Sequence, residues 1–259
     1  ILTAIEAIKY SLNSNFSQMG SNTFTISNQE MVQRRGGDRE WFKLISYKEV
    51  KEFKERYDFP AKVSVHTWFS STATLKFQSE STNPNVAVHA IDENYIISSG
   101  FTIADGRNIN KEEAVSGQNV ILLGNDIVEF LFGGGISPIG QQIRLGGTMY
   151  TVIGTLEEKG SSLGMNVDNA AYIPLYNARK NSANNLQYSI SVFVDDAEVM
   201  DEAMNEATQL FRLIRKLKPE DKNNFSVTKS NSLAQMLIEN IQYVTLAATM
   251  IGLITLAGA

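Results

Sequence analysis

The feature that most restricts the fold of this chain is a charge-free run at its C-terminal end. Glu239 is the last charged residue, and no side chain from Asn240 to Ala259 carries a charge. A helix of this length would span about 30 Å, the thickness of the hydrocarbon core of a bilayer. The alternative is a helix buried in a protein core, which usually still carries charge on one face. The run therefore predicts a membrane helix.

Apolar residues recur at helical spacing near both ends of the chain. One such stripe alone would fit an ordinary amphipathic helix packed on its own domain. A stripe at each end favours two stalk helices rising from the membrane, over residues 1–20 and 231–259, the second continuing into the membrane helix. The stalk positions that we expect to couple motion are Ile5, Ile8, Leu12, Phe16, Leu233, Leu237 and Ile241.

The flanks of the two stalks contain few basic residues. Lys9 is the only basic residue in residues 1–20, and none follows Lys229. By the positive-inside rule, such flanks fit the non-cytoplasmic side of a membrane. Since the chain starts at Ile1 without a methionine and stops inside an apolar run, it reads as a piece of a longer protein.

Between the stalks the sequence alternates between helix and strand patterns, which predicts an α+β fold. Ser46 and Glu49 have the spacing of a capping box, and the helix that they begin should run to about Tyr57. Alternating apolar residues predict strands near both ends of this region and around the helix. These expected strands are Thr23–Ser27, Lys62–Phe69, Ala73–Ser79, Val86–Ile91, Tyr188–Val194 and Phe225–Thr228, with a second helix over 196–217.

From Asp92 the pattern changes to short apolar runs broken by Gly and Asn. The expected elements are a loop at Gly100–Asn110, a strand at Asn119–Leu123, a helix at Asp126–Phe132 capped by Asn125, and a hairpin of Ile143–Leu145 and Met149–Leu156. Such a β-rich stretch between two α/β pieces looks like an insertion. We therefore predict one α/β part formed by residues 21–91 and 188–230, with an inserted part over 92–187.

Candidate chemistry is scarce. The chain has no cysteine, and His66 and His89, its only histidines, fall in expected strands where packed or surface rings are the usual finding. The Gly133–Gly135 triplet lacks the Lys-Ser/Thr of a phosphate loop, and Asp195–Asp196 suits the capping of a helix. The net charge of −5 gives no indication of a nucleic-acid partner. The sequence therefore predicts no catalytic, cofactor-binding or metal-binding residue.

An ordered series of sequence blocks supplies a further signal. The blocks are IKYSLNSNFSQMGSNTFTI (Ile8–Ile26), IDENYIISSGFTIADGRNI (Ile91–Ile109), NVILLG (Asn119–Gly124), LFGGGISPIGQQIRL (Leu131–Leu145), YTVIGTLEEKGSSLG (Tyr150–Gly164) and AAYIPL (Ala170–Leu175). In order and spacing they resemble the extracytoplasmic domain of MacB-type ABC transporter permeases. The resemblance covers nearly the whole chain.

The resemblance implies an α/β porter-like subdomain formed by the two flanks and an inserted, mostly β, sabre-like subdomain. It also implies a location on the periplasmic side of the bacterial inner membrane. The implied partners are a second permease protomer, a cytoplasmic ABC ATPase, and a periplasmic adaptor or outer-membrane protein. ATP would be used by a fused or separate domain, because this chain has no nucleotide-binding motif.

Two functions stay open at this point. The first is the outer domain of a transporter, which passes ATP-driven motion through the stalks to substrate on the outer side of the membrane. The second is a permease-like regulator that recruits and activates an extracytoplasmic partner such as a cell-wall hydrolase. The inserted β-rich part favours the transporter, because such regulators typically carry smaller outer domains. The substrate cannot be read from the sequence.

Overall fold

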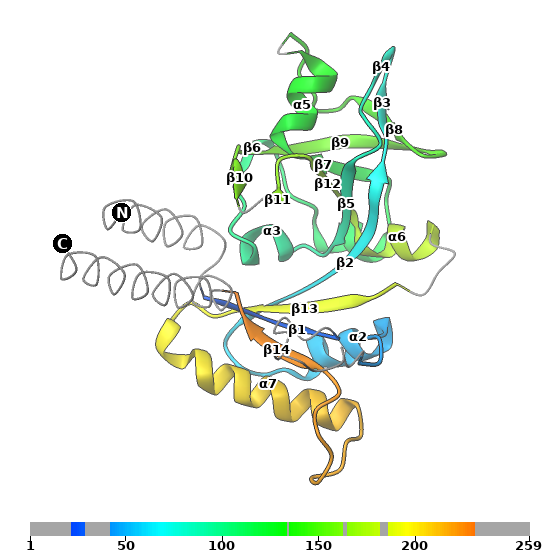
Figure 1. Cartoon of the computed structure of the whole chain (residues 1–259). Coiled ribbons are helices and arrows are strands. Elements are labelled where there is room, and N and C mark those ends of the chain that lie inside the picture. The colour runs from blue at the N-terminus through cyan, green and yellow to red at the C-terminus, as the bar shows by residue number, and fades with distance from the viewer. Residues whose placement is uncertain (1–21, 29–41, 134, 163–164, 182–185, 231–259) are drawn as a thin grey trace, which may run out of the picture.

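The computed structural model describes residues 22–28, 42–133, 135–162, 165–181 and 186–230 (Figure 1). Within these residues the strands are β1 (Thr23–Ser27), β2 (Lys62–Ala73), β3 (Leu75–Phe77), β4 (Glu80–Ser81), β5 (Val86–Ile91), β6 (Ile103–Gly106), β7 (Val120–Leu123), β8 (Gln142–Leu145), β9 (Thr148–Leu156), β10 (Ser161–Ser162), β11 (Met165–Asn166), β12 (Ala170–Pro174), β13 (Tyr188–Phe193) and β14 (Ser226–Lys229). The helices are α2 (Tyr47–Arg56), α3 (Tyr95–Ser98), α4 (Lys111–Ser116), α5 (Asn125–Phe132), α6 (Leu175–Asn181) and α7 (Met200–Ile214), with a 3-10 turn at Ala197–Val199.

One mixed sheet contains all the described strands except the small hairpin of β10 and β11. Its order is β14-β1-β13-β2-β5-β12-β7-β9-β8-β3-β4, and β6 pairs with β9. Most pairs are antiparallel, while β5 with β12 and β7 with β9 are parallel. The mixed sheet with few helices confirms the predicted α+β class.

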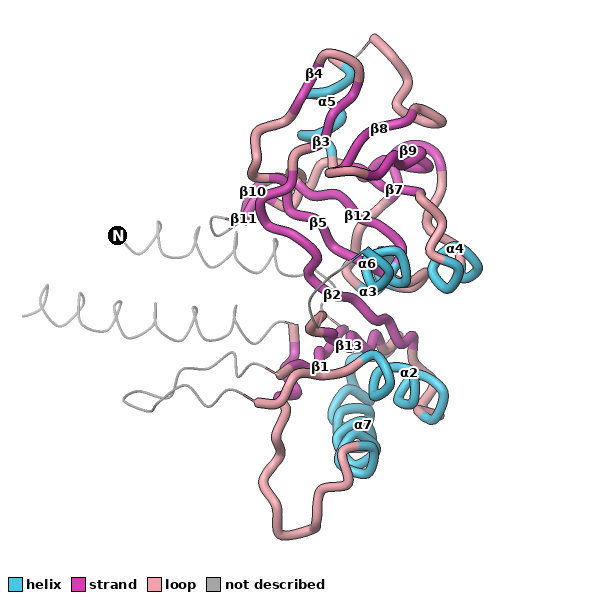
Figure 2. The backbone as a smooth tube through the Cα atoms, turned by 90° about the vertical axis from the view of Figure 1, so that its right-hand side faces the viewer, coloured by secondary structure: helices cyan, strands magenta, loops and turns pink. Residues whose placement is uncertain are grey.

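The lower part of the molecule in Figure 1 comprises residues 22–28, 42–67 and 187–230. Strands β14, β1, β13 and the first half of β2 form its antiparallel sheet. Figure 2 shows α2 and α7 on the same side of these strands. Phe53 of α2 packs its ring 6.0 Å from that of Phe211 of α7, and Tyr57 donates a hydrogen bond of 2.9 Å to the Ala203 carbonyl. Apolar burial between the sheet and the two helices therefore stabilises the lower part.

The upper part comprises the described residues between 68 and 181. Its strands run from the second half of β2 through β5, β12, β7, β9 and β8 to β3 and β4. Buried residues of α3, α4 and of strands β5, β7, β9 and β12 form a second apolar cluster beside the main core. The cluster includes Ile91, Ile96, Leu122, Ile153 and Tyr172.

Local sequence signals account for many of the element boundaries. The Ser46 capping box is confirmed, since Ser46 Oγ accepts from Glu49 N–H and the Glu49 carboxylate accepts from Ser46 N–H. The predicted cap of α5 is wrong, because Gly124 holds the N-cap position and Asn125 is already helical. The predicted loop at Gly100–Asn110 is also wrong in part, because β6 forms there by pairing with β9.

The division into two flanks and an insertion at residues 92–187 stays a prediction. Strand β5, which we placed in the flanking part, is hydrogen-bonded to β2 on one side and to β12 of the middle segment on the other. None of the described helices is long and apolar enough to cross a membrane. The charge-free run Asn240–Ala259 lies outside the described residues, as do both predicted stalks.

Candidate functional site at the junction of the sheet

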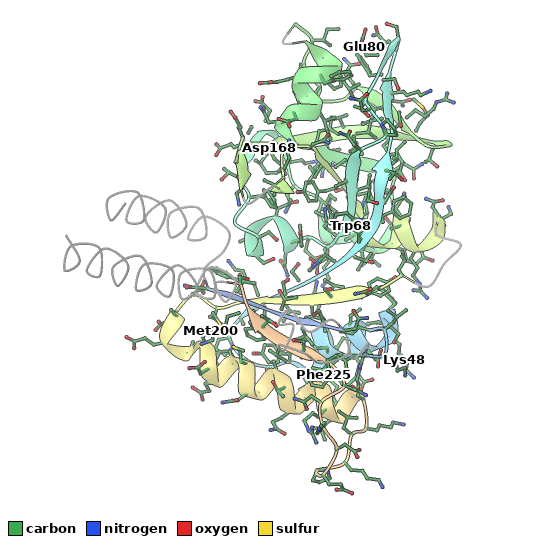
Figure 3. The ribbon with its side chains drawn as sticks, in the orientation of Figure 1. Lys48, Trp68, Glu80, Asp168, Met200 and Phe225 are labelled. Carbon is green, nitrogen blue, oxygen red and sulfur yellow. The ribbon has the colours of Figure 1, made fainter. Side chains whose placement is uncertain are left out.

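Strand β2 joins the lower part to the upper part of the molecule. Its first half pairs with β13 and its second half pairs with β5, and only His66 and Thr67 have Cα partners on both sides. The register shifts twice beyond this point, between Trp68 and Ser70 and between Ser70 and Ala73. Figure 3 shows Trp68 just above the point where β2 passes from one part to the other. A motion of one part relative to the other must therefore act on the middle of β2.

A buried ionic cluster connects helix α2 of the lower part to the end of β5. Lys54 Nζ lies 2.7 Å from Asp92 Oδ2 and 2.9 Å from Glu93 Oε1. The Asp92 side chain is only 5% exposed, and its Oδ2 also accepts a 2.9 Å hydrogen bond from the backbone N–H of Val65. Since Val65 lies on β2 and Lys54 on α2, one carboxylate holds three elements together.

Burial and charge act in opposite directions on the three ionisable groups of this cluster. Burial raises the pKa of Asp92 above its ordinary value, although the Lys54 ammonium opposes this. Burial lowers the pKa of Lys54, but the attraction and hydrogen bonds of the two carboxylates outweigh it and leave that pKa raised. Burial likewise raises the pKa of Glu93, but its bonds to Lys54 and to the backbone leave it lowered. Removing one charge would leave the others in an apolar surrounding, which is costly.

Further hydrogen bonds cross the junction on both sides of this cluster. Asn94 donates from Nδ2 to the carbonyl of Val63 on β2 at 2.8 Å. Thr23 of β1 donates from Oγ1 to the carbonyl of Ser98 at the end of α3 at 2.9 Å, in a buried contact. Within the lower part, beside the crossing point, Thr67 donates from Oγ1 to the carbonyl of Gln187 at 2.7 Å. The junction is thus fixed mainly by polar contacts, which are specific in direction and can be exchanged for water when a contact opens.

Aromatic rings and both histidines line the upper side of the junction. The ring of His66 lies 4.9 Å from that of Tyr95, while His89 packs against Trp68 at 4.5 Å and against Tyr172 at 5.6 Å. Burial lowers the pKa of His66 to about 3, with repulsion from His89 as the second cause, and burial lowers the pKa of His89 to about 4. Both rings are therefore neutral at pH 7.

Two buried polar atoms of β2 lack a hydrogen bond in the described part of the chain: Ser64 Oγ and His66 Nδ1. A buried polar atom without a partner typically costs about 1–3 kcal/mol. His66 lies where the two parts of the sheet meet, and Ser64 lies two residues before it, where β2 pairs with β13 alone. The present arrangement of the junction is therefore less stable than a fully paired strand would be.

The first and last described strands lie side by side in the lower part. Phe24 of β1 is the Cα partner of Lys229 of β14, and the N–H of Ser230 donates to the carbonyl of Thr23 at 2.9 Å. Strand β1 is also paired with β13, which pairs directly with β2. The first and last described strands are therefore neighbours, with β1 two strands and β14 three strands away from β2.

The seven predicted stalk residues, between Ile5 and Phe16 and between Leu233 and Ile241, lie outside the described residues, so their role stays a prediction. The structure instead brings together Lys54, Asp92 and Glu93, which we did not single out from the sequence. A usable signal existed, because Asp92, Glu93 and Asn94 follow directly on a predicted apolar strand. Asp196 caps a helical turn by accepting from Glu198 N–H, as its position suggested. Among the described residues no group of three His, Cys, Asp or Glu is placed to hold a metal ion.

Comparison with known proteins supports the family suggested by the sequence blocks. The MacB-like periplasmic core domain family model matches residues 1–210. The macrolide export ATP-binding/permease protein MacB of an Azoarcus species is 24% identical over 196 residues, which is 75% of this chain and 28% of that protein. The chain therefore spans less than a third of the length of this relative.

Two solved structures share the fold. The periplasmic region of MacB from Actinobacillus actinomycetemcomitans matches with a TM-score of 0.66 at 19% identity, covering 88% of this chain and 97% of that chain. The extracellular domain of the transporter YknZ from Gram-positive bacteria matches with a TM-score of 0.59 at 20% identity, covering 80% of this chain and 100% of that one. At these identities the structures support the fold, while the family match extends over most of the sequence. This chain belongs to the MacB-like periplasmic core domain family.

Proposed function

We propose that this chain is the extracytoplasmic domain of an ABC transporter permease, on the periplasmic side of the bacterial inner membrane, and that it transmits ATP-driven motion to substrate on the outer side. The observation that carries the proposal is the side-by-side pairing of β1 and β14. Two stalks attached there would move these strands together, and β13 would pass the displacement to β2. The junction would then convert it into a movement of the upper part.

In this proposal the chain is not catalytic, and ATP is hydrolysed by a cytoplasmic domain that is fused to the permease or encoded separately. Its partners would be a second permease protomer and, outside the membrane, an adaptor or outer-membrane protein. The name of the Azoarcus relative, a macrolide exporter, makes macrolides the first substrates to examine for efflux.

The proposal can be tested by measuring distances between the two protomers of the full-length transporter. This chain has no cysteine, so Lys48→Cys in the lower part and Val115→Cys in the upper part can each receive a spin label within it. Both positions are exposed. We expect the distance distributions of both labels to change between the nucleotide-free and ATP-trapped states.

Two lysines of helix α2, one at the junction and one exposed, supply a matched pair of variants for the same measurement. Lys54→Met removes the ionic contact with Asp92, whereas Lys51→Met removes an exposed pair with Glu55 on the same helix. We expect Lys54→Met to abolish the ATP-dependent change at position 115 while position 48 still responds, and Lys51→Met to change neither. Identical distances with and without ATP in the unmodified transporter would contradict transmission. ATP-dependent movement in a protein that exports no substrate would instead favour the regulator of an extracytoplasmic partner.

A further inference from the structure

An open hollow of about 720 Å³ lies in the upper part, away from the junction cluster of Lys54 and Asp92. It is found where β3 and β8 stop pairing, beside the Gly146–Gly147 turn that connects β8 to β9. Because it lies at the open end of the strand pair, residues from both faces of the sheet contribute to its wall. The chemistry of the wall indicates what it would bind.

Two cations meet at this hollow. Lys76 of β3 and Arg144 of β8 are direct Cα partners in the antiparallel register, so their side chains emerge on the same face. Like charges placed directly opposite each other destabilise a sheet. Neither cation forms an ion pair within the described residues, and none of the described residues lining the hollow is acidic. A chain with a net charge of −5 thus has a local excess of positive charge at this place.

Uncharged residues form the remainder of the wall, mostly with hydroxyl groups or carbon side chains, together with the amide residue Asn181. Thr74 and Thr148 belong to it, together with Phe69 at the end of the regular part of β2 and the buried Tyr150. Tyr150 is only 2% exposed and its hydroxyl already donates a 2.6 Å hydrogen bond to Asn177, so it closes the inner side of the hollow, and Phe69 provides the aromatic surface. A ligand that fits must offer negative charge to the cations and an apolar body to the Phe69 ring.

We propose that this hollow binds a small organic anion, with its carboxylate or phosphate group between Lys76 and Arg144 and its apolar part on Phe69. An anion placed there removes the repulsion between the two cations and gains charge-assisted hydrogen bonds from both. The guanidinium of Arg144 offers two parallel donors to a planar carboxylate or to a phosphate. The inference does not depend on the transmission of motion, because it concerns binding alone.

The test uses three aromatic probes that differ in charge: fluorobenzoate, fluorophenyl phosphate and the neutral fluorobenzyl alcohol. Binding is measured by fluorine NMR on the full-length protein in lipid nanodiscs, with empty nanodiscs as the blank. We expect saturable binding of at least one anion and none of the alcohol. The anion that binds more tightly identifies the group, carboxylate or phosphate, that the hollow prefers.

The variant Lys76→Gln/Arg144→Gln should weaken anion binding by at least about tenfold, as expected for the loss of charged hydrogen bonds. The control Lys48→Gln/Lys222→Gln removes two exposed cations from the lower part, where Figure 3 shows Lys48, and should leave binding unchanged. Unchanged melting temperatures of both variants exclude a loss through unfolding. Binding of the alcohol as tight as that of the anions would overturn the proposal. So would anion binding that the Lys76→Gln/Arg144→Gln variant retains, or the absence of anion binding to the unmodified protein.

Discussion

At the scale of single residues, the carboxylate of Asp92 holds more of the junction together than any side chain around it. It accepts hydrogen bonds from the Lys54 ammonium, from the backbone N–H of Val65 and, through Oδ1, from the N–H of Asn94. These donors belong to α2, to β2 and to the segment that begins α3. A change at Asp92 therefore affects several elements, whereas a change at Lys54 affects mainly one.

The first prediction ranks three substitutions by their effect on the free energy of unfolding. Asp92→Ala leaves the Lys54 ammonium with Glu93 alone and the buried N–H of Val65 without its acceptor, and should cost about 3 kcal/mol. Lys54→Met should cost less, about 1–2 kcal/mol, because Lys54 is 32% exposed and Asp92 keeps its backbone donors. Lys51→Met breaks only an exposed pair and should change stability by less than about 0.5 kcal/mol. Urea unfolding followed by circular dichroism measures all three, and a loss in Lys51→Met equal to that in Asp92→Ala would contradict the ranking.

The second prediction concerns acid stability. The pKa of His66 is lowered to about 3 and that of His89 to about 4 in the folded protein, below the ordinary value near 6.5. Between the folded and the unfolded pKa values, the unfolded chain binds protons that the folded chain does not. The stability that the two neutral rings contribute is therefore complete above about pH 6.5 and is lost as the pH falls toward 3. His66→Phe removes one of the two titrating rings and keeps an aromatic contact with Tyr95.

The melting temperature of His66→Phe should therefore fall less than that of the unmodified chain between about pH 7 and pH 4. At neutral pH the variant should be at least as stable, because the unpaired Nδ1 atom of His66 is removed. Equal losses on acidification in both proteins would show that His66 does not contribute to acid instability.

At the scale of elements, close backbone packing restricts the turn between β7 and α5. An added Cβ at Gly124 would overlap the carbonyl oxygen of Asp168 and lie 3.0 Å from the carbonyl oxygen of Ala170. The backbone at Gly124 has a φ of −71° that any residue can adopt, so only the space excludes a side chain. The segment before β12 thus packs directly on the start of α5.

The third prediction compares two glycines of the upper part. Gly124→Ala should destabilise the fold by about 3 kcal/mol, since backbone atoms must move to admit the methyl group. At Gly135 a Cβ would meet nothing within 4 Å, so Gly135→Ala should change stability by less than about 0.5 kcal/mol. Thermal unfolding of the two variants measures the difference. Equal melting temperatures would show that the segment at Asp168 can shift at little cost.

The elements that could be predicted are those specified by neighbouring residues. The Ser46–Glu49 capping box is complete within four residues, and the strand predicted at Val86–Ile91 has the observed bounds of β5. Strand β6 could not be predicted from its own loop-like sequence, because its partner β9 lies about fifty residues further on. The junction was missed for the same reason, since Lys54 and Asp92 are separated by 38 residues and meet only after α2 has packed on β2.

At the scale of the whole molecule, the lower part can be separated from the upper part at one place in the sheet. Thr67 of β2 is the Cα partner of Tyr188 of β13, so the chain leaves the lower part and returns to it at neighbouring positions. The predicted insertion of 92–187 would instead begin directly after β5. Its boundary therefore separates β5 from β12, the strand that pairs with β5 on the side opposite β2. The two boundaries make different predictions about excision.

The fourth prediction is that replacing residues 69–186 by a short Gly/Ser linker leaves a lower part that unfolds cooperatively, because closing a loop between adjacent ends costs little. Replacing residues 92–187 should produce a less soluble protein, because β5 loses β12 and exposes a strand edge. Circular dichroism and size-exclusion chromatography of the two shortened chains provide the comparison. Cooperative unfolding and full solubility of the second chain would favour the boundary at residue 92.

The pairing of β1 also affects the order in which the protein can be completed during synthesis. Thr25 of β1 meets Ser191 of β13 only 166 residues later, and β14 follows later still. The strands from β5 to β12 have all their partners by Pro174, so the upper part can assemble while β1 is still unpaired. Until the ribosome has released the β14 segment, Phe24 and Ile26 lack the neighbours that bury them in the finished fold. A pause in translation before β14 therefore leaves an open, apolar strand edge as the vulnerable feature of the nascent chain.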